Sequence, residues 1–297
     1  MTRKQRELRE RANLELYMQN NLDACLDAIM GLYDRIPNTG GDFKPLFRYR
    51  KLNGDELESL DHETIFMRWP SSYEDKSDCK PVVDYKEIAT YIGDHKYHIS
   101  DDEKLTSGMD IKSIENNPEV LKRLDKIRNM WMISCFTEKK DNKCMWSEYA
   151  DYHSGICLEY DFKKVLDKVK EAGGEMRIMP VRYIEDRDCC SDMALNHKDL
   201  LNMNDDAATE AKYKLACMTK EKLLYSFEEE WRLIYDREKK IEDEQEQEQK
   251  QKTGDSIPFI NPKRIICGKA VDQNSAEYKK LIEIAEDKGI EMVQMDH

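Results

Sequence analysis

Four short segments combine polar, charged and aromatic side chains, and these are the places where the sequence indicates chemistry. They are the segments FRYR, SCFTE, MWSEY and FEEEWR at residues 47–50, 134–138, 145–149 and 227–232. The common catalytic signatures are absent: there is no phosphate loop, no dinucleotide-binding glycine fingerprint, no His-Glu-x-x-His and no nucleophile elbow. Any activity must therefore be argued from these four segments.

Two glutamates in the last segment, Glu228 and Glu230, are the strongest candidates for chemistry. If the segment is a strand, their spacing puts both carboxylates on one face. Carboxylates on one face are ligands for hard cations, and with Asp75 they would form the metal site of a nuclease. No lysine lies at the offset such a nuclease needs. The two carboxylates could equally pair with arginines, Arg232 among them.

Alternation of apolar and polar residues predicts the elements that must position these segments. Strands are expected at 46–52, 64–70, 130–138, 154–162, 176–184, 228–236 and 290–295, with further β character over 257–268. Helices are expected at 55–61, with Asp55 as the cap, in 85–129 with Pro118 at a helix start, at 195–224, and at 274–289 with Gly289 at the end. Residues 142–153 read as a helix or helical turn, and 71–85 as a loop.

Two further segments are expected to stand apart from the main body. Residues 1–40 carry a helical apolar stripe and predict an N-terminal helical arm, which packs on its own domain or on a partner. Residues 238–255 are rich in charge and poor in apolar side chains, so we expect a mobile loop inside a β-hairpin. The predicted strands come in clusters. This order predicts one α+β domain over 41–297, with a mixed, mostly antiparallel central sheet and flanking helices.

The composition narrows the partners and the compartment. The 297 residues include 37% charged side chains and a formal net charge of -13, which disfavours nucleic-acid binding. Nine cysteines occur without a Cys-x-x-Cys pair, as is typical of reduced thiols rather than a zinc site or disulfide framework. No apolar run is long enough for a membrane span, and the first residues do not resemble a secretory signal. We therefore expect a cytoplasmic protein with no membrane contact.

The four segments also resemble a known bacterial family, the domain of unknown function 2971. Its pattern appears here in order as FRYR, SCFTE, MWSEYADYHSGICLEYD, FEEEWRLI and KRIICG, over about residues 46–270. One departure stands out. Where the family usually has Phe-Asn-Asp-Pro-Phe, this chain has YEDK at 73–76 and keeps only the aspartate.

The order of these segments is similar to that of ADP-ribosyltransferase-like folds, which implies a split sheet and NAD as co-substrate. By this resemblance Arg48 or Arg50 would hold the pyrophosphate, because a guanidinium binds it bidentately. Ser134 would shape the nicotinamide pocket, and Glu230, with Glu228, would stabilise positive charge on the ribose. The aromatic side chains that could wall the nicotinamide are Tyr49, Phe136, Trp146 and Tyr149.

Each of these residues also has a purely structural interpretation. The arginines could form a solvated or salt-bridged face, Ser134 could bond to backbone, and Trp146 could belong to the core. The leading expectation is an ADP-ribosyltransferase-like enzyme or NAD glycohydrolase, as a toxin or phage-defence effector, with a protein or nucleic-acid acceptor. The alternatives are a metal-dependent nuclease and a non-catalytic interaction module that binds a protein partner through the N-terminal helix.

Overall fold

The computed structural model describes residues 45–95, 111–173, 175–186, 191–201, 207–236 and 253–295. The predicted N-terminal arm and most of the predicted charged loop lie outside these residues. Within them, no helix is of the length and apolarity that crossing a bilayer would require. The six cysteines in the described part are all free thiols: Cys79, Cys135, Cys144, Cys157, Cys217 and Cys267.

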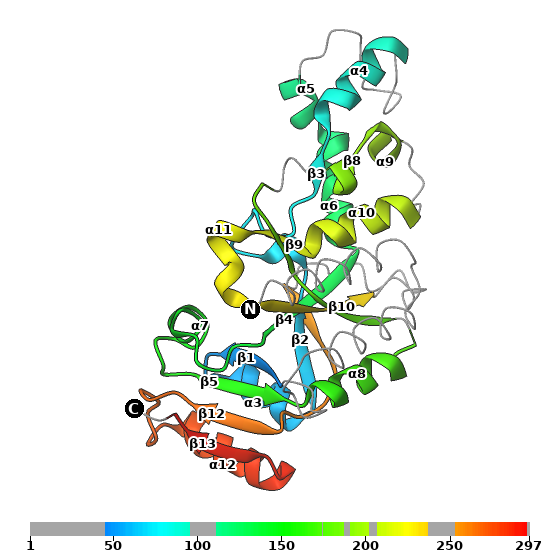
Figure 1. The fold of residues 1–297 in the computed structure, drawn as a ribbon. Coiled ribbons are helices and arrows are strands. Elements are labelled where there is room, and N and C mark those ends of the chain that lie inside the picture. Colours follow the sequence, from blue (N-terminus) through cyan, green and yellow to red (C-terminus); the bar gives the residue numbers. More distant parts are fainter. Residues whose placement is uncertain are drawn as a thin grey trace, which may run out of the picture.

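A nine-stranded sheet lies at the centre of the described residues (Figure 1). Its order is β11-β2-β4-β1-β5-β12-β13, with β10 on the other edge of β4 and β6 next to β10. All pairings are antiparallel except that of β12 with β13. The strands are β1 Leu46–Arg50, β2 Thr64–Arg68, β4 Trp131–Thr137, β5 Ile156–Tyr160, β6 Met176–Pro180, β10 Glu230–Asp236, β11 Gly254–Pro258, β12 Arg264–Cys267 and β13 Glu291–Gln294.

Two small parallel pairs complete the strands: β3 Val82–Val83 with β8 Ala194–Leu195, and β7 Arg182–Ile184 with β9 Thr219–Glu221. The predicted α+β class with a mixed, mostly antiparallel sheet is confirmed. The ADP-ribosyltransferase-like arrangement stays a prediction.

The sheet divides along one edge of β4. β1 pairs with this strand at Thr137, and β2 pairs with it at Ile133. The other edge of β4 pairs with β10 along its whole length. Because β1 and β2 meet β4 at different points, the residues between, centred on Cys135, lie where the two neighbouring strands separate.

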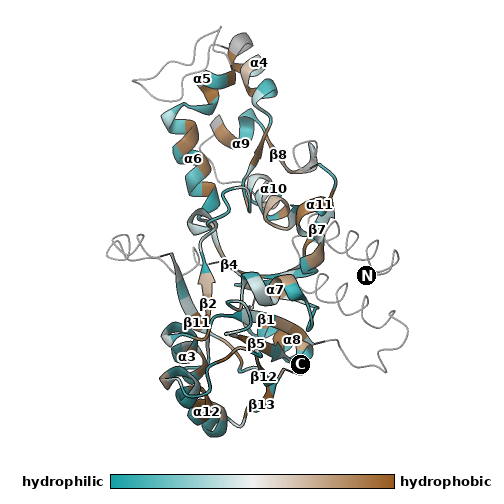
Figure 2. Ribbon diagram, turned by 90° about the vertical axis from the view of Figure 1, so that its left-hand side faces the viewer, coloured by the Kyte–Doolittle hydropathy of each residue, from teal (hydrophilic) through white to brown (hydrophobic). Residues whose placement is uncertain are grey.

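Helices cover the sheet and extend it at one end (Figure 1). α4, α5, α6, α9 and α10 lie together above the sheet, while α3 and α12 lie at the opposite end and contact each other. In Figure 2 these helices carry both hydrophobic (brown) and hydrophilic (teal) residues along their length. The helices are α3 Gly54–Asp61, α4 Tyr85–His95, α5 Ile111–Glu115, α6 Pro118–Arg128, α7 Lys143–Glu148, α8 Phe162–Glu171, α9 His197–Leu201, α10 Ala207–Cys217, α11 Lys222–Tyr225 and α12 Ala276–Lys288, with 3₁₀ turns η1 Pro70–Ser72, η2 Ser191–Met193 and η3 Ser226–Glu228.

Local signals explain where the helices begin and end. The Asn117 side chain caps α6 just before Pro118, whose missing N–H costs nothing at a first helical position. The Ser275 hydroxyl caps α12, and Gly289 ends it in the left-handed region at φ 64°. The predicted cap of the first helix was wrong by two residues: the Asn53 side chain accepts the hydrogen bond, and Asp55 lies inside the first turn.

Three predicted elements are corrected by pairing partners far away in the sequence. The helix expected over 195–224 is interrupted, because residues 219–221 pair with 182–184. For the same reason, the single strand expected over 176–184 is two strands. The expected hairpin around the charged stretch is also wrong, since β10 pairs with β4 and β6, whereas β11 pairs with β2. Strand β11 includes Gly254 and Asp255, which were expected in the charged loop.

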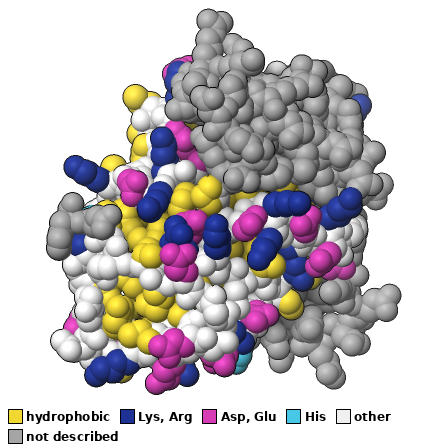
Figure 3. Space-filling view, turned by 60° about the horizontal axis from the view of Figure 1, so that its bottom comes forward, with side chains coloured by type: hydrophobic (Ala, Val, Ile, Leu, Met, Phe, Trp, Pro, Cys, Tyr) yellow, Lys and Arg dark blue, Asp and Glu magenta, His cyan; other side chains and the backbone are white. Residues whose placement is uncertain are grey.

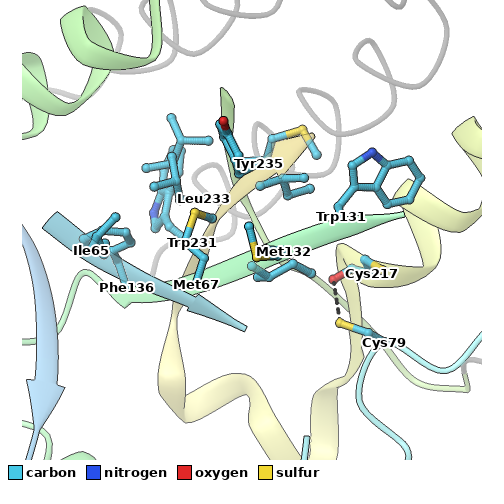
Figure 4. Close-up of a cluster of buried hydrophobic side chains, with 14 of the residues drawn as sticks. Ile65, Met67, Cys79, Trp131, Met132, Phe136, Cys217, Trp231, Leu233 and Tyr235 are labelled. Carbon is cyan, nitrogen blue, oxygen red and sulfur yellow. Dashed lines mark hydrogen bonds between the residues drawn. The ribbon is translucent and has the colours of Figure 1, made fainter. Parts of the chain in front are cut away.

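The largest hydrophobic cluster packs against the central strands (Figure 4). Trp231 and Leu233 of β10 lie beside Phe136 of β4 and Met67 of β2, and all four are almost fully buried. The aromatic rings of Phe162 on α8 and Trp231 meet edge to face at 4.9 Å. On the face shown in Figure 3, apolar side chains lie among positive side chains (Lys, Arg) and negative ones (Asp, Glu). The two kinds of charge are interspersed there.

Candidate active site

The pairing register separates the predicted site residues onto two faces of the sheet. Directly opposed residues of antiparallel strands point to the same face, and neighbours along a strand alternate. Glu230 is opposite Thr137, whereas Ser134 is opposite Leu233. Thr137 is also opposite Phe47, so Arg48 points away from Glu230. The predicted convergence of Arg48, Ser134 and Glu230 on one hollow is therefore wrong.

The two arginines of β1 bind a glutamate rather than presenting a free phosphate clamp. Arg50 Nε donates to Glu56 of α3 at 2.5 Å, and Arg48 lies 3.8 Å from the same carboxylate. Arg48 also donates to the carbonyl of Phe66 at 3.1 Å, which joins β1 to β2 across the split of the sheet. Burial, followed by the neighbouring Arg50, lowers the pKa of Arg48. The salt-bridged interpretation of this pair is confirmed.

Ser134 and Phe136 share the face of Arg48 and are buried. The Ser134 hydroxyl has no hydrogen-bond partner within the described residues, so the backbone bond considered for it is not formed. The Phe136 ring packs edge to face on Tyr160 at 5.4 Å and near Phe259 at 6.2 Å. Phe136 is therefore a core residue.

The opposite face holds a buried ion network of five side chains: Asp78, Lys220, Glu228, Glu230 and Arg232. Lys220 Nζ lies 2.7 Å from a carboxylate oxygen of Glu228 and 2.7 Å from one of Glu230. Arg232 donates to Glu230 at 2.7 Å and binds both oxygens of Asp78 at 2.8 and 2.9 Å. Three carboxylates share two cations here, and each carboxylate has at least one cation within ion-pair distance, which offsets the cost of burying these charges.

Arg232 also ties the network to the helical part of the protein. Its Nη1 donates to the carbonyl of Cys217, at the end of α10, at 2.6 Å, and contacts the sulfur of Cys79 at 2.8 Å. The close approach of Cys79 and Cys217 is drawn in Figure 4. The carboxylates are thus held from both the sheet and the helices.

A left-handed backbone turn brings Glu228 back to this network. Glu228 ends the 3₁₀ turn η3 rather than lying in the strand, and Glu229 has φ 43° and ψ 52°. The expected position of Glu228 on the strand face of Glu230 is thus corrected. Both carboxylates still reach one ammonium, Lys220, so they lie close together.

The environment drives the two glutamates to opposite pKa shifts. Burial, followed by repulsion from Glu230, raises the pKa of Glu228. Burial also acts against the charge of Glu230, but Arg232 and Lys220 outweigh it and hold the pKa of Glu230 well below its ordinary value. Glu230 is therefore a permanent anion, whereas Glu228 is the carboxylate able to exchange a proton.

Tyr149 connects Glu228 to the surface. Its hydroxyl donates to Glu228 at 3.0 Å, and 45% of the residue is exposed. Its position follows from helix α7, which begins after Asn142. The Asn142 side chain caps α7 and also donates to the carbonyl of Phe227 at 2.7 Å, so α7 and the Glu228 turn are joined directly.

Tyr49 of β1 and Trp146 of α7 pack against each other on the face of the sheet that carries the ion network, and both are buried. Their rings meet edge to face at 5.1 Å in a second hydrophobic cluster. The Tyr49 hydroxyl donates to the carbonyl of Lys139 at 2.8 Å. Of the four predicted aromatic walls, Tyr149 is thus the one that is both exposed and in contact with a candidate carboxylate.

Solvent reaches the sheet at Cys135, where β1 and β2 separate. The residue is exposed, although Ile133 and Thr137, its neighbours on the same face, are buried. It lies opposite Arg232, on the face of the sheet that carries the network. Desolvation by the surrounding protein, followed by the Glu230 carboxylate, raises the pKa of the Cys135 thiol. The thiol is therefore protonated and able to donate to that carboxylate.

Backbone strain borders this region on two sides. Asp151, Tyr152 and His153 form a run of three left-handed residues, with φ 49°, 53° and 70°, directly after Tyr149 and Ala150. Glu229, between the two carboxylates, and Cys79, which contacts Arg232, are also left-handed, at φ 43° and 52°. Each such residue costs about 1–2 kcal/mol, and strain of this kind gathers at functional sites.

The metal-site alternative receives no support from this geometry. Lys220 occupies the position between the carboxylates that a cation would take. Asp75 binds elsewhere, accepting from Ser77 and from the Tyr225 hydroxyl. No group of three or more His, Cys, Asp or Glu side chains is arranged to hold a metal in the part of the chain that the structure describes.

Sequence reasoning missed Lys220, Asp78 and Cys135. Lys220 lies in a segment expected to be helix, and Asp78 lies in a stretch expected to be loop. Nothing in their spacing connects them to Glu230. Cys135 carried a usable signal, because it stands in one of the four polar-aromatic segments.

These features define an α+β protein with a buried ion network at the split of its sheet. Residues 145–280 match the family described as "Protein of unknown function (DUF2971)", which supports over this range the family resemblance of the motifs. Lys220, Glu228, Glu230 and Arg232 lie inside the matched range. No curated protein and no solved structure matches the chain significantly.

Proposed function

We propose that the chain is an NAD-using enzyme, an ADP-ribosyltransferase or NAD glycohydrolase, whose reacting carboxylate is Glu228. The observation that carries the proposal is the pair of glutamates with opposite pKa shifts, sharing Lys220 and connected to the surface by Tyr149. Neighbouring carboxylates driven apart in pKa are typical of acid-base sites. The exposure of Cys135, on the face of the sheet that carries Glu230, supports a site rather than a closed core.

The chemistry assigns each group one task. The bond between ribose C1′ and the nicotinamide nitrogen breaks, and its electron pair stays on the nitrogen, so nicotinamide leaves as a neutral molecule. Positive charge develops on the ribose, and the fixed negative charge of Glu230 stabilises it. An acceptor or water then bonds to C1′, and ionised Glu228 takes its proton.

The test is release of nicotinamide, or transfer of label, from labelled NAD by the purified full chain with and without a cell lysate. We expect Glu228→Gln to lower the rate at least about a hundredfold, the scale of a lost proton-transfer group. The matched control is Glu148→Gln, the same change on an exposed side chain one residue before Tyr149. That variant should keep the wild-type rate.

Two results would contradict the proposal. One is a wild-type protein that neither releases nicotinamide nor transfers label. The other is an active protein whose rate is unchanged in Glu228→Gln. A stability measurement on the same variant separates lost chemistry from lost folding.

The biological role remains part of the proposal. An enzyme that consumes NAD inside the cell would act as a toxin or phage-defence effector in the reducing cytoplasm, where six free thiols are stable. The acceptor would be a protein or nucleic acid. With a net charge of -13, the protein would bind nucleic acid poorly, so a protein acceptor or water is favoured.

A further inference from the structure

A short strap of chain, residues 73–79, crosses the ion network. It lies in the connection between η1 and β3 and runs beside α11 (Figure 1). Residues 74–77 are exposed, whereas Asp78 reaches inward and accepts hydrogen bonds from Arg232 through both carboxylate oxygens, at 2.8 and 2.9 Å. The Asp78 carboxylate also lies 3.7 Å from Lys220 Nζ. The strap therefore covers the two cations of the network.

Asp75 and Asp78 hold the strap to the rest of the molecule. Asp78 binds Arg232 of β10, and Asp75 accepts a hydrogen bond of 2.6 Å from the hydroxyl of Tyr225 on α11. Within the strap, the backbone N–H of Asp78 donates to the carbonyl of Asp75 at 3.3 Å, so the chain turns on itself there. An exposed segment with local backbone hydrogen bonds belongs to the part of a fold that opens at low cost in free energy.

Cys79 forms the inner end of the strap and is under backbone strain. Its φ of 52° is in the left-handed region, which residues other than glycine rarely adopt. The side chain is completely buried, with the sulfur against Arg232 and near the Cys217 carbonyl (Figure 4). Movement of the strap would relieve the strain and bring the Cys79 sulfur into solvent.

We propose that the strap is a lid, which swings away from Arg232 and Lys220 while the rest of the fold stays intact. Glu228 and Glu230 are each only 3% exposed, so a substrate can reach them only if part of the protein moves. Glu230 is fixed by strand pairing with β4, whereas Asp78 comes from an exposed segment. The role of the lid in a reaction rests on the proposed function, but its opening does not.

The experiment measures how fast iodoacetamide modifies individual cysteines of the native full chain, with mass spectrometry of the digested protein as the readout. Each rate is divided by the rate of the same cysteine in the denatured chain, which removes differences in thiol reactivity. Cys157 is the internal reference, because it is as completely buried as Cys79 but lies in the central strand β5. We expect the normalised rate of Cys79 to be at least about tenfold higher.

Low concentrations of urea separate opening of the lid from unfolding of the whole protein. Opening exposes little surface, so the Cys79 rate should stay nearly constant, whereas the Cys157 rate should rise steeply. Asp75→Asn weakens the bond to Tyr225 and should speed modification of Cys79 at least about threefold, and Asp78→Asn at least about tenfold. The matched control is Glu74→Gln, which removes a charge from the exposed neighbour of Asp75 and should leave the rate unchanged.

Equal normalised rates for Cys79 and Cys157, with the same dependence on urea, would overturn the lid, because Cys79 would then react through global unfolding. An unchanged Cys79 rate in both aspartate variants would also overturn it. NAD cleavage by a protein whose Cys79 reacts only on global unfolding would overturn the lid and leave the enzyme. A lid that opens in a protein that cleaves no NAD would keep the lid and overturn the enzyme.

Discussion

Arg232 shows how much of this site depends on single side chains. It is completely buried, and its guanidinium contacts Glu230, Asp78, Cys79 and Cys217 at once. The sequence indicated that Glu228 and Glu230 could pair with Arg232; Glu230 does so, whereas Glu228 pairs with Lys220. The partners from outside the strand could not be predicted, because they depend on where a loop and α10 come to lie in three dimensions.

Removing the Arg232 charge should strongly destabilise the protein. In Arg232→Gln, Glu230 and Asp78 lose their bidentate partner inside the protein, and such a loss typically costs about 3–5 kcal/mol. Denaturant unfolding would measure the change. The control is Arg264→Gln, whose side chain is 28% exposed and pairs with Glu159 and Glu291. Its cost should stay within about 1 kcal/mol, and equal losses in both variants would contradict the role of burial.

The raised pKa of Glu228 predicts a pH dependence of known sign. The folded state holds this proton more tightly than the unfolded state, so stability is greatest below the unfolded pKa. It then falls as pH rises from the ordinary value of 4.5 through the raised value. Glu228→Gln lacks this decrease. The stability difference between the variant and wild type should therefore shift in favour of the variant as pH rises over that interval.

Unfolding free energies measured at several pH values would test this prediction. The lowered pKa of Glu230 gives a stabilising contribution that is lost only as pH falls below the ordinary value, so it does not mask the effect. A difference between variant and wild type that is constant across the interval would contradict the shift.

At the scale of elements, the turn between α7 and β5 depends on close backbone contacts. Gly268 donates its N–H to the carbonyl of Gly155, and Ala270 donates to that of His153. A Cβ on Gly268 would lie 2.1 Å from the His153 carbonyl oxygen, which no side chain can do. The left-handed run from Asp151 to His153 is therefore held by backbone that leaves no room for adjustment.

Gly268→Ala should consequently destabilise the protein by at least about 2 kcal/mol and loosen the turn. Gly54→Ala is the control, since nothing lies within 4 Å of its Cβ position and Gly54 is the first residue of α3. That variant should be neutral or slightly stabilising. Thermal unfolding of the two proteins would show the contrast, and similar melting temperatures would refute the steric argument.

Elements were predicted where the signal is local. Pro118 and Gly289 each act through one turn of helix, so the helix ends that they mark could be predicted from the sequence. Pairing of distant segments has no such local signal. The β character on both sides of the charged stretch therefore predicted a hairpin. In the structure, β11 pairs with β2 and not with β10.

The whole molecule carries a formal net charge of -13. Its folded state is compact, so these charges repel one another more than in the unfolded chain. Adding salt from about 20 to about 200 mM should screen this repulsion and raise the melting temperature by about 2 °C. Sucrose, which does not screen charge, separates the effect from general exclusion of solutes. A fall in melting temperature with salt would show that attractive ion pairs dominate instead.

The candidate site belongs to this largest scale as well. Segments with suitable residues could be recognised from the sequence, but the face on which each residue points depends on strand register. A shift of one residue reverses that face. Ser134 and Cys135 illustrate this: the hydroxyl is enclosed with Phe136, while the next side chain opens to solvent beside Glu230.

The exposed thiol at the split of the sheet also has a practical consequence. A mercury compound soaked into crystals should bind Cys135 and provide phases. Because Cys135 lies opposite Arg232 on the face that carries Glu230, the same derivative would mark the position of the ion network. Cys144 is also exposed, at the start of α7, so a pair of spin labels on the two thiols could report how α7 moves relative to β4.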